Sequence, residues 1–364
     1  MTHAASITNA AEWMKGAALG DRRALSRFCR LLDDLSALDS AARSEVLRAL
    51  YSEVAPRGTW TLGITGSPGA GKSTLVSALL HQLRALGKRC AVLAIDPTSP
   101  FSGGALLGDR IRMQDHFQDP EVFIRSLATR GAHGGLSRST ADQLRALRLW
   151  GAEVILVETV GVGQDETDVA AVADTTCVVL TPGMGDDVQA NKAGILETAD
   201  VFAVNKSDRP GAERVVSDLQ SMLALGRITR GADAGPIFGA RHSGAGALPQ
   251  RSSTGEGAEY WEPPIVQCSA SLGQGIAELM AALTQHRDWL NNTDAGRERL
   301  VERRLRSART QVLAAVVDVL RRDHGASLDE LSHAVAAGRL DAHSATTQLI
   351  AVLGSSAGVV TDRT

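Results

Sequence analysis

The segment GSPGAGKST, residues 66–74, has the residue types of a phosphate-binding loop. Gly66, Gly71, Lys72 and Ser73 fit the pattern G-x-x-x-x-G-K-[ST], in which glycines let backbone N–H groups turn toward phosphate oxygens and a helix N-terminus faces the anion. Lys72 is expected to reach the β- and γ-phosphates, and the Ser73 hydroxyl to ligate Mg²⁺. The alternative is a Gly-rich turn without a ligand. The nucleotide contacts expected from this loop are Gly66, Ser67, Pro68, Gly69, Ala70, Gly71, Lys72, Ser73 and Thr74.

A second motif, VNKSD at residues 204–208, predicts which base is bound. The carboxylate of Asp208 can accept two hydrogen bonds, from the N1–H and the 2-amino group of guanine. Adenine offers no such pair of donors, and an unpaired buried carboxylate costs roughly 1–3 kcal/mol. Asn205 and Lys206 are expected to shape the base pocket, although a lone N-K-x-D is often a strand-end turn. Backbone N–H groups for the guanine oxygen are expected from the segment CSA, at Ser269 and Ala270.

Two carboxylates end apolar runs and are candidates for holding the metal. Asp96 ends the run CAVLAID, and oxygen ligands of this kind suit a hard cation; its alternative role is to cap the turn that follows. Glu158 ends the run EVILVE, where it can hold Mg²⁺ through a water molecule. Gly161, three residues later, would let a backbone N–H approach the γ-phosphate, so that loss of this phosphate frees the loop.

The elements that must position these residues are short apolar runs separated by segments of helical periodicity. Such runs lack polar alternation, which is typical of parallel strands buried on both faces. The sequence therefore predicts an α/β fold, a P-loop NTPase with a mostly parallel sheet flanked by helices and with helical extensions at both ends. The predicted strands cover residues 59–65, 90–96, 122–127, 153–159, 175–181, 201–206 and 264–270.

Three regions follow from these patterns. Residues 1–54 are predicted to form an N-terminal helical extension, and residues 55–290 the P-loop domain. Within this domain, residues 226–264 are rich in Gly, Ser, Arg and Pro and are predicted to form a long surface loop. Residues 291–364 are predicted to form a helical C-terminal region, whose apolar stripe either packs on the P-loop domain or forms a homodimer interface.

Composition excludes several classes of protein. The 364-residue chain is 44% hydrophobic and 22% charged with a net charge of -3, which gives no reason to expect a nucleic-acid partner. No apolar run reaches the ~18 residues that a membrane-spanning helix needs, and no signal-peptide pattern opens the chain. The four cysteines are far apart and without a C-x-x-C, so neither a disulfide framework nor a Cys-rich metal site is expected. These features predict a cytoplasmic protein.

The remaining motifs extend a resemblance that covers nearly the whole chain. The segments DPTSPFSGGALLGDRIRM, ETVGVGQDE, TPGMGDDVQANKAGILETAD and PPIVQCSASLGQGI occur in the order seen in the methylmalonyl-CoA mutase-associated GTPases, long labelled as arginine/ornithine transport kinases. The first of these is not a general P-loop element, which makes the resemblance specific. It implies a homodimeric GTP-hydrolysing chaperone of an adenosylcobalamin-dependent acyl-CoA mutase, with a cobalamin adenosyltransferase as a further partner.

The resemblance also implies roles for two loops. Asp109, in GDRIRM, corresponds to an acidic residue near the metal or the attacking water, whereas its alternative is a solvated loop aspartate. Together with Lys72 and Glu158 it completes the predicted catalytic set. The stretch GMGDDVQANKAG is implied to be a further nucleotide-sensing switch, and its alternative is a plain strand–helix connection. Its polar members are Asp186, Asp187, Gln189 and Lys192.

Two other functions share the phosphate-binding motif. A small-molecule kinase would need a substrate pocket with a catalytic base, and no separate lid segment carries one. A metallochaperone GTPase for nickel or zinc usually carries clusters of Cys and His, which this sequence lacks. The sequence therefore favours a Mg²⁺-dependent GTP hydrolase that acts as a switch over both alternatives.

Overall fold

The computed structural model describes residues 3–33, 38, 40–53, 58–96, 116, 118–128, 138–159, 165–183, 198–230 and 260–357. The chain divides into two compact units, Met1–Arg306 and Ser307–Thr364, and the division falls within helix α12 (Asp294–Asp323). In the described part of the chain, no helix is both long and apolar enough to cross a membrane.

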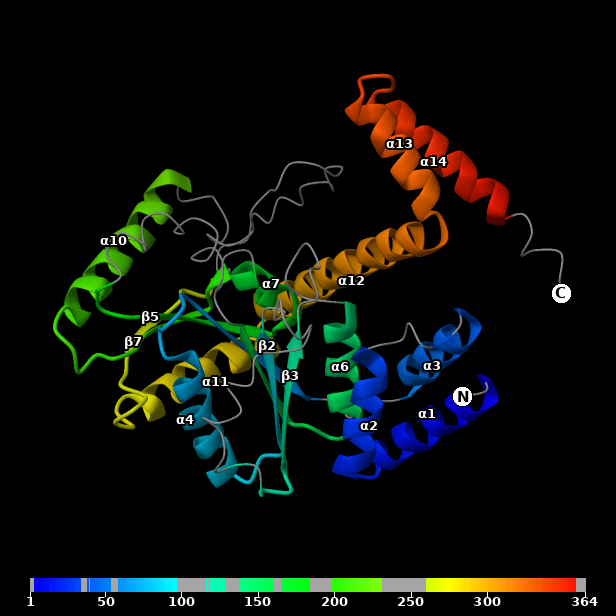
Figure 1. Ribbon diagram of the computed structural model, residues 1–364. Coiled ribbons are helices and arrows are strands. Elements are labelled where there is room, and N and C mark those ends of the chain that lie inside the picture. Colours follow the sequence, from blue (N-terminus) through cyan, green and yellow to red (C-terminus); the bar gives the residue numbers. More distant parts are fainter. Residues whose placement is uncertain are drawn as a thin grey trace. The chain divides into compact units, whose positions relative to one another are not determined.

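The first unit is built on one parallel sheet (Figure 1), which confirms the predicted P-loop NTPase fold. Among the described residues the strand order is β3-β2-β4-β1-β5-β6-β7, and every neighbouring pair runs parallel. The strands are β1 (Trp60–Thr65), β2 (Cys90–Asp96), β3 (Val122–Ala128), β4 (Val154–Thr159), β5 (Thr175–Leu180), β6 (Val201–Val204) and β7 (Ile265–Gln267).

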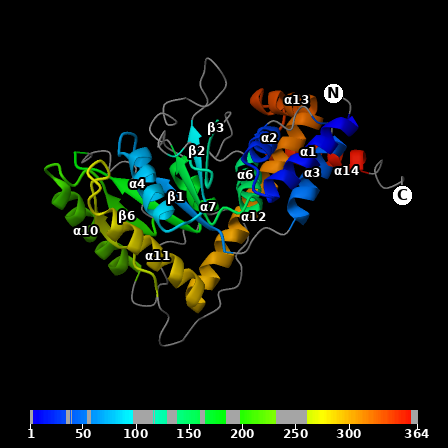
Figure 2. The same cartoon turned by 90° about the horizontal axis from the view of Figure 1, so that it is seen from below.

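Helices cover both faces of this sheet, as its unbroken apolar strands require. Cys90 and Val92 of β2 face α4 (Lys72–Ala85) and α11 (Ile276–Asn292), which lie side by side in Figure 1 and Figure 2. The alternate residues Ala91 and Leu93 face the other layer. That layer consists of α1 (His3–Ala18), α2 (Arg22–Asp33), α3 (Ser40–Ser52), α6 (Arg138–Leu149) and α7 (Asp165–Val172), with α10 (Ala212–Arg230) against β5 and β6.

The predicted strands are confirmed, five of them to within one residue at each end, and the larger differences are in β6, β7 and helix α10. β6 stops at Val204 rather than 206, because Lys206 has a left-handed backbone (φ 57°) that no strand continues through. β7 covers only three residues of the predicted 264–270. Helix α10 runs on to Arg230, five residues into the predicted loop, because a single glycine inside a helix costs only ~1 kcal/mol. Residues 231–259 of that loop lie outside the described residues.

A fully buried carboxylate, Asp200, lies just before β6 and joins four parts of the first unit. Its oxygens accept hydrogen bonds from the backbone N–H of Thr176 (2.8 Å) and from the guanidinium groups of Arg299 (2.8 Å) and Arg303 (2.7 Å) of α12. Its backbone oxygen accepts one from the Trp261 indole (2.7 Å). Burial alone would raise the pKa of Asp200, but the two arginines outweigh burial and hold it below its usual range.

His286 of α11 completes this buried cluster as a neutral imidazole. The Trp60 indole donates to Thr175 Oγ1 (2.9 Å), so the Thr175 hydroxyl can donate to His286 Nδ1 (2.9 Å). The proton of the neutral ring then lies on Nε2, 3.4 Å from Asp200 Oδ1. Burial lowers the pKa of His286 from 6.5 to about 4, with the nearby arginines contributing in the same direction and Asp200 opposing them.

The second unit contains the remainder of α12, then α13 (Gly325–Ala336) and α14 (Ala342–Ala357), which pack together. Its part of α12 exposes large apolar side chains within the single chain. These are Val312, Leu313, Val316, Val317 and Val319.

We predict that His286 makes stability depend on pH in the acid range. Its pKa in the folded protein, about 4, is below the unfolded value of 6.5, so the unfolded chain binds the extra proton first as pH falls. The free energy of unfolding should therefore drop by up to about 3 kcal/mol between pH 6.5 and pH 4. Urea unfolding of the wild type and of His286→Gln checks this. The variant should show a clearly shallower slope in this window, and parallel pH profiles would contradict the assignment.

Candidate nucleotide-binding site

The predicted phosphate-binding loop connects the carboxyl end of β1 to the N-terminus of α4, at the centre of the sheet. Gly66 has φ +134°, and a side chain there would collide with the carbonyl oxygen of Val179 on β5. Gly71 has φ +88° and precedes the first residue of α4. Left-handed backbone at these positions therefore needs glycine, as the motif has it.

The charged and hydroxyl groups of the motif are buried at this turn. The ammonium group of Lys72 donates to the carbonyl oxygens of Gly66 (2.6 Å) and Ser67 (3.0 Å). The Ser73 hydroxyl donates to Glu158 Oε1 at 2.6 Å, and both side chains are buried. Glu158 reaches this position because β4 pairs with β1 at Ile64↔Glu158, which places the end of β4 beside the loop.

Asn205, the first residue after β6, ties the phosphate-binding loop to the base motif. Its side-chain amide donates to the carbonyl oxygen of Ala70 (2.8 Å), and its side-chain oxygen accepts the backbone N–H of Ala270 (3.0 Å). Its backbone N–H donates to Leu180 at the end of β5 (2.8 Å). The side chain is only 2% exposed, so its hydrogen bonds form away from water, where leaving them unmade is costly.

The rest of the base motif is held by short contacts to both loops. The Lys206 ammonium donates to the carbonyl oxygen of Gly69 at 2.6 Å, so its alkyl chain extends along the phosphate-binding loop. The buried Ser269 hydroxyl donates to Asp208 Oδ1 at 2.6 Å. This hydrogen bond is the main reason why the pKa of Asp208 is lowered, which keeps the exposed carboxylate ionised and able to accept hydrogen bonds from a base.

A cavity of about 430 Å³ opens beside these residues, between α4 and the turn that precedes α11. Thr74, the last residue of the phosphate-binding loop, and Ala270, which contacts Asn205 of the base motif, both line it. Its volume and its mixture of hydroxyl, amide and imidazole groups suit part of a nucleoside. The other lining residues are Ser77, Ala78, His81, Gln82, Ser271, Gly273 and Ile276.

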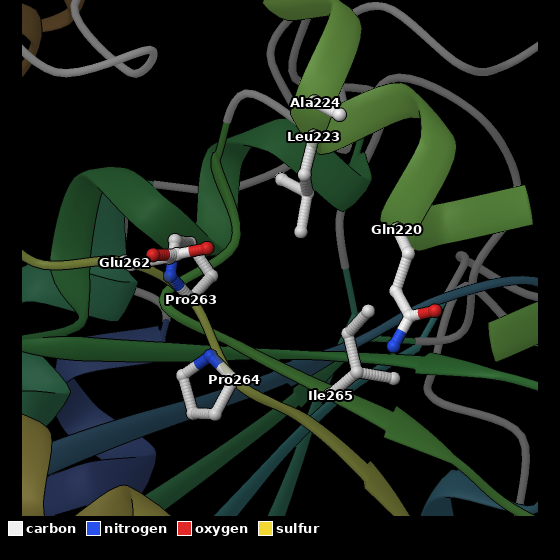
Figure 3. Close-up of a pocket in the computed structure, with 7 residues that line it drawn as sticks. All are labelled: Gln220, Leu223, Ala224, Glu262, Pro263, Pro264 and Ile265. Carbon is white, nitrogen blue, oxygen red and sulfur yellow. The ribbon is translucent and has the colours of Figure 1, made fainter. Parts of the chain in front are cut away.

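A second cavity of about 440 Å³ lies between α10 and the segment entering β7 (Figure 3). Figure 3 shows Leu223 of α10 and Ile265 of β7 projecting into this space, with Pro263 and Pro264 along one side. The one charged side chain of its lining is Glu262, a carboxylate that does not suit a phosphate. The candidate nucleotide site is therefore the phosphate-binding loop and the base motif, next to the first cavity.

The structure brings together most of the predicted site residues that it describes. The loop 66–74, Glu158, the base motif and residues 269–270 lie at one edge of the sheet, as the carboxyl ends of parallel strands require. Asp96 ends β2 at the same edge, although its side chain is outside the description. Outside the described residues lie Asp109, Gly161, Asp186, Asp187, Gln189 and Lys192.

Several residues of the site could not be expected from the sequence. For Ser269 the sequence predicts a role only for the backbone N–H. In the structure its side-chain hydroxyl also takes part, by donating a hydrogen bond to Asp208. Ser77, His81 and Gln82 line the cavity because they follow Thr74 along one face of α4. Ser77 follows Thr74 by three residues and His81 follows Ser77 by four, which indicates a shared helix face but not whether that face lines a site.

The arrangement suits one kind of ligand. A Gly-rich turn with a buried lysine and a helix N-terminus favours a polyanion, and the Ser73–Glu158 pair adds oxygen donors of the type that a hard cation prefers. An ionised Asp208 offers an acceptor to the edge of a base. The backbone N–H groups predicted to serve as donors are engaged within the protein, that of Ser269 with the carbonyl oxygen of Gln274 and that of Ala270 with Asn205 Oδ1. The geometry therefore supports binding of a nucleoside di- or triphosphate.

Comparison with known proteins supports the same conclusion. The family model described as methylmalonyl Co-A mutase-associated GTPase MeaB matches residues 25–324. A Pyrococcus abyssi protein with GTPase in its name is 41% identical over 301 residues, covering 83% of this chain and 82% of the relative. GTPase ArgK of Escherichia coli is 33% identical and covers 72% of both chains. The mouse methylmalonic aciduria type A homolog is 34% identical, covering 64% of this chain and 55% of its own length.

A solved structure shares the fold over almost the whole chain. The crystal structure described as LAO/AO transport system kinase aligns with a TM-score of 0.63 and 23% identity, covering 95% of this chain and 98% of that one. At this identity the likeness concerns the fold alone.

The contact between Gly71 and Asn205 gives a testable prediction. A Cβ atom at Gly71 would lie 2.5 Å from Asn205 Nδ2, whereas one at Gly69, which also has positive φ, would meet nothing within 4 Å. Both alanine variants pay the left-handed backbone penalty of ~1–2 kcal/mol. Only Gly71→Ala should also lose the buried Asn205 hydrogen bonds, at a further ~1–3 kcal/mol. Urea unfolding measures the difference, and equal losses in the two variants would show that Asn205 does not join the loops.

Proposed function

This chain belongs to the methylmalonyl-CoA mutase-associated GTPase family, and we propose that it is a Mg²⁺-dependent GTP hydrolase that acts as a switch for an adenosylcobalamin-dependent acyl-CoA mutase. In this proposal, nucleotide state gates cofactor loading and protects the mutase. The observation that carries the proposal of nucleotide binding is the buried side chain of Asn205. This one side chain is hydrogen-bonded to the phosphate-binding loop and to Ala270 of the base loop. A protein that recognised only phosphate would have no need of this connection.

Guanine selectivity rests on Asp208. Its carboxylate, fixed by the Ser269 hydroxyl, accepts hydrogen bonds from the N1–H and the 2-amino group of guanine. For the guanine oxygen we propose the backbone N–H of Ala270, which would have to exchange its hydrogen bond to Asn205 Oδ1 for one to the base. Adenine would present an acceptor to this carboxylate where guanine presents a donor, so ATP is expected to bind far more weakly.

The phosphate end supplies positioning and charge. Lys72 leaves its loop carbonyls to contact the β- and γ-phosphates, and the backbone N–H groups at the start of α4 surround the same oxygens. The hydroxyl of Ser73 and the carboxylates of Glu158 and Asp96 are the groups that would hold Mg²⁺, which when bound neutralises developing charge on the phosphates. We assign Asp109 a role beside the metal or the attacking water.

Two segments are proposed to report the nucleotide state. Gly161 follows β4 and would meet the γ-phosphate through its backbone N–H. The segment containing Asp186, Asp187, Gln189 and Lys192 follows β5, whose end pairs with the base motif through Leu180. Both segments leave the sheet at the edge that carries the phosphate-binding loop, so either can respond to loss of a phosphate.

The C-terminal region, residues 291–364, is proposed to hold two copies of the chain together. The family name supports the mutase as partner, and the apolar side chains that α12 exposes support a second copy as the occupant of this surface. Leu313 is 67% exposed and Val312 62%, values that are unusual for neighbouring large apolar residues on a folded protein. A cobalamin adenosyltransferase is a further proposed partner, and the cytoplasm the proposed location.

We predict that Asp208→Asn changes the base that is bound. The asparagine amide donates where the aspartate accepts, so it clashes with the 2-amino group of guanine but suits the 2-oxo group of xanthine. GDP affinity should fall by a factor of about 100 or more, and xanthosine diphosphate affinity should rise above that of the wild type. Titration of both nucleotides against both proteins measures this. Retained preference for GDP in the variant would contradict the role of Asp208.

The switch function is tested by GTP turnover, alone and with each cobalamin-dependent acyl-CoA mutase encoded beside this gene. Acceleration by at least about fivefold with one mutase is expected if nucleotide state and partner binding are coupled. Lys72→Ala, which should remain folded and bind the partner but not hydrolyse GTP, is the matched control. Absence of acceleration by any mutase, with phosphate appearing on a small molecule, would instead support a kinase.

A further inference from the structure

The buried Asp200 cluster lies at the opposite end of β6 from the base motif. Its carboxylate binds Arg299 and Arg303, one helical turn apart on α12, and the backbone of Thr176 at the start of β5. Arg303 also donates to the backbone oxygen of Asp174, at 2.7 Å. The first turns of α12, residues 294–303, are thus fixed to the amino ends of the two strands that lead to the site.

β6 is short and is fixed at both ends. It spans four residues, so Asp200 and Asn205 are separated by roughly 16 Å of extended chain at about 3.3 Å per residue. At the amino end, Asp200 accepts the N–H of Thr176, and at the carboxyl end Asn205 donates to Leu180. Parallel strands have no connecting turn to set their register, and a slip of one residue would exchange the side chains on the two faces of the sheet and displace the residues at both strand ends.

We propose that Asp200 is a positioning residue for guanine recognition, because it links the docking of residues 294–303 of α12 to the placement of Asn205 and Asp208 at the other end of β6. This inference rests on the proposed function. It adds that guanine nucleotide binding and docking of the start of α12 stabilise one another, so that whatever acts on this helix changes nucleotide affinity.

The negative charge of Asp200 holds residues 294–303 of α12 against the amino end of β6. Arg299 and Arg303 have side chains only 12% and 13% exposed, and Asp200 is the acidic partner that both share. Removing its charge leaves two largely buried guanidinium groups without this counter-ion, and such groups move toward water when they can. The start of α12 would then leave its place, and the amino end of β6 would lose its hydrogen bonds to that helix.

The coupling between GDP binding and docking of the start of α12 can be measured on the intact protein, because it acts equally in both directions. If docking of the helix raises GDP affinity, then GDP must stabilise the docked helix by the same factor. Such couplings are typically about 5- to 150-fold. GDP should therefore slow amide hydrogen exchange in residues 294–303, more than 10 Å of strand away from the base motif, by roughly tenfold.

The experiment measures hydrogen exchange of the full chain with and without GDP, together with GDP affinity and GTP turnover, for the wild type, Asp200→Asn and Arg303→Gln. Both variants should lose the GDP-dependent slowing in residues 294–303 and bind GDP about tenfold more weakly. Turnover at saturating GTP should stay within about twofold, because the phosphate end is untouched. Arg303→Gln leaves the ion pair between Asp200 and Arg299 in place, so this variant is expected to fold. If Asp200→Asn does not fold, the GDP affinity and hydrogen exchange of Arg303→Gln test the inference.

Arg304→Gln is the matched control, because Arg304 is the exposed neighbour of Arg303 and belongs to the same helix. It should behave as the wild type does. The inference is overturned if the wild type binds GDP but exchange in residues 294–303 does not respond, or if Arg303→Gln keeps wild-type GDP affinity. A wild type that binds no GDP at all would instead overturn the proposed function.

Discussion

The buried side chain of Asn205 is the constraint on which the site depends. It spans the gap between the carbonyl oxygen of Ala70 and the backbone N–H of Ala270, so the phosphate-binding loop and the base loop cannot move independently. A carboxamide can do this because it offers a donor and an acceptor at one end of a short side chain. Gly71 must stay without a side chain for the same reason, since a Cβ atom would occupy the place of the amide.

The sheet provides the frame for this connection. β1 is central and β5 separates it from β6, so the phosphate-binding loop and the base motif leave the same sheet edge a short distance apart. Glu158 arrives at that edge from the other neighbour of β1. At the opposite edge, Asp200 fixes β5, β6 and α12 together. Both ends of β6 therefore carry a buried polar side chain, while its own residues contribute only apolar packing.

Much of this could be predicted from the sequence because the signals are local. Apolar runs predicted all seven described strands, and the G-x-x-x-x-G-K-[ST] and N-K-x-D patterns predicted the residues that meet at the site. What could not be predicted depends on contacts across long stretches of chain. Asp200 and Arg303 are 103 residues apart, and nothing in the sequence around either one indicates the other. The side-chain role of Ser269 was likewise decided by tertiary structure and not by local pattern.

We expect the framework formed by Asn205, Asp208 and the phosphate-binding loop to select guanine nucleotides. Calorimetric titration of the full chain with GDP and with ADP, each with Mg²⁺, tests it most directly. We expect GDP to bind at least about 100-fold more tightly than ADP, because a site built to satisfy Asp208 by hydrogen bonds strongly rejects a base that leaves it unpaired. Equal affinity for the two nucleotides would contradict the account, since the base motif would then take no part in recognition.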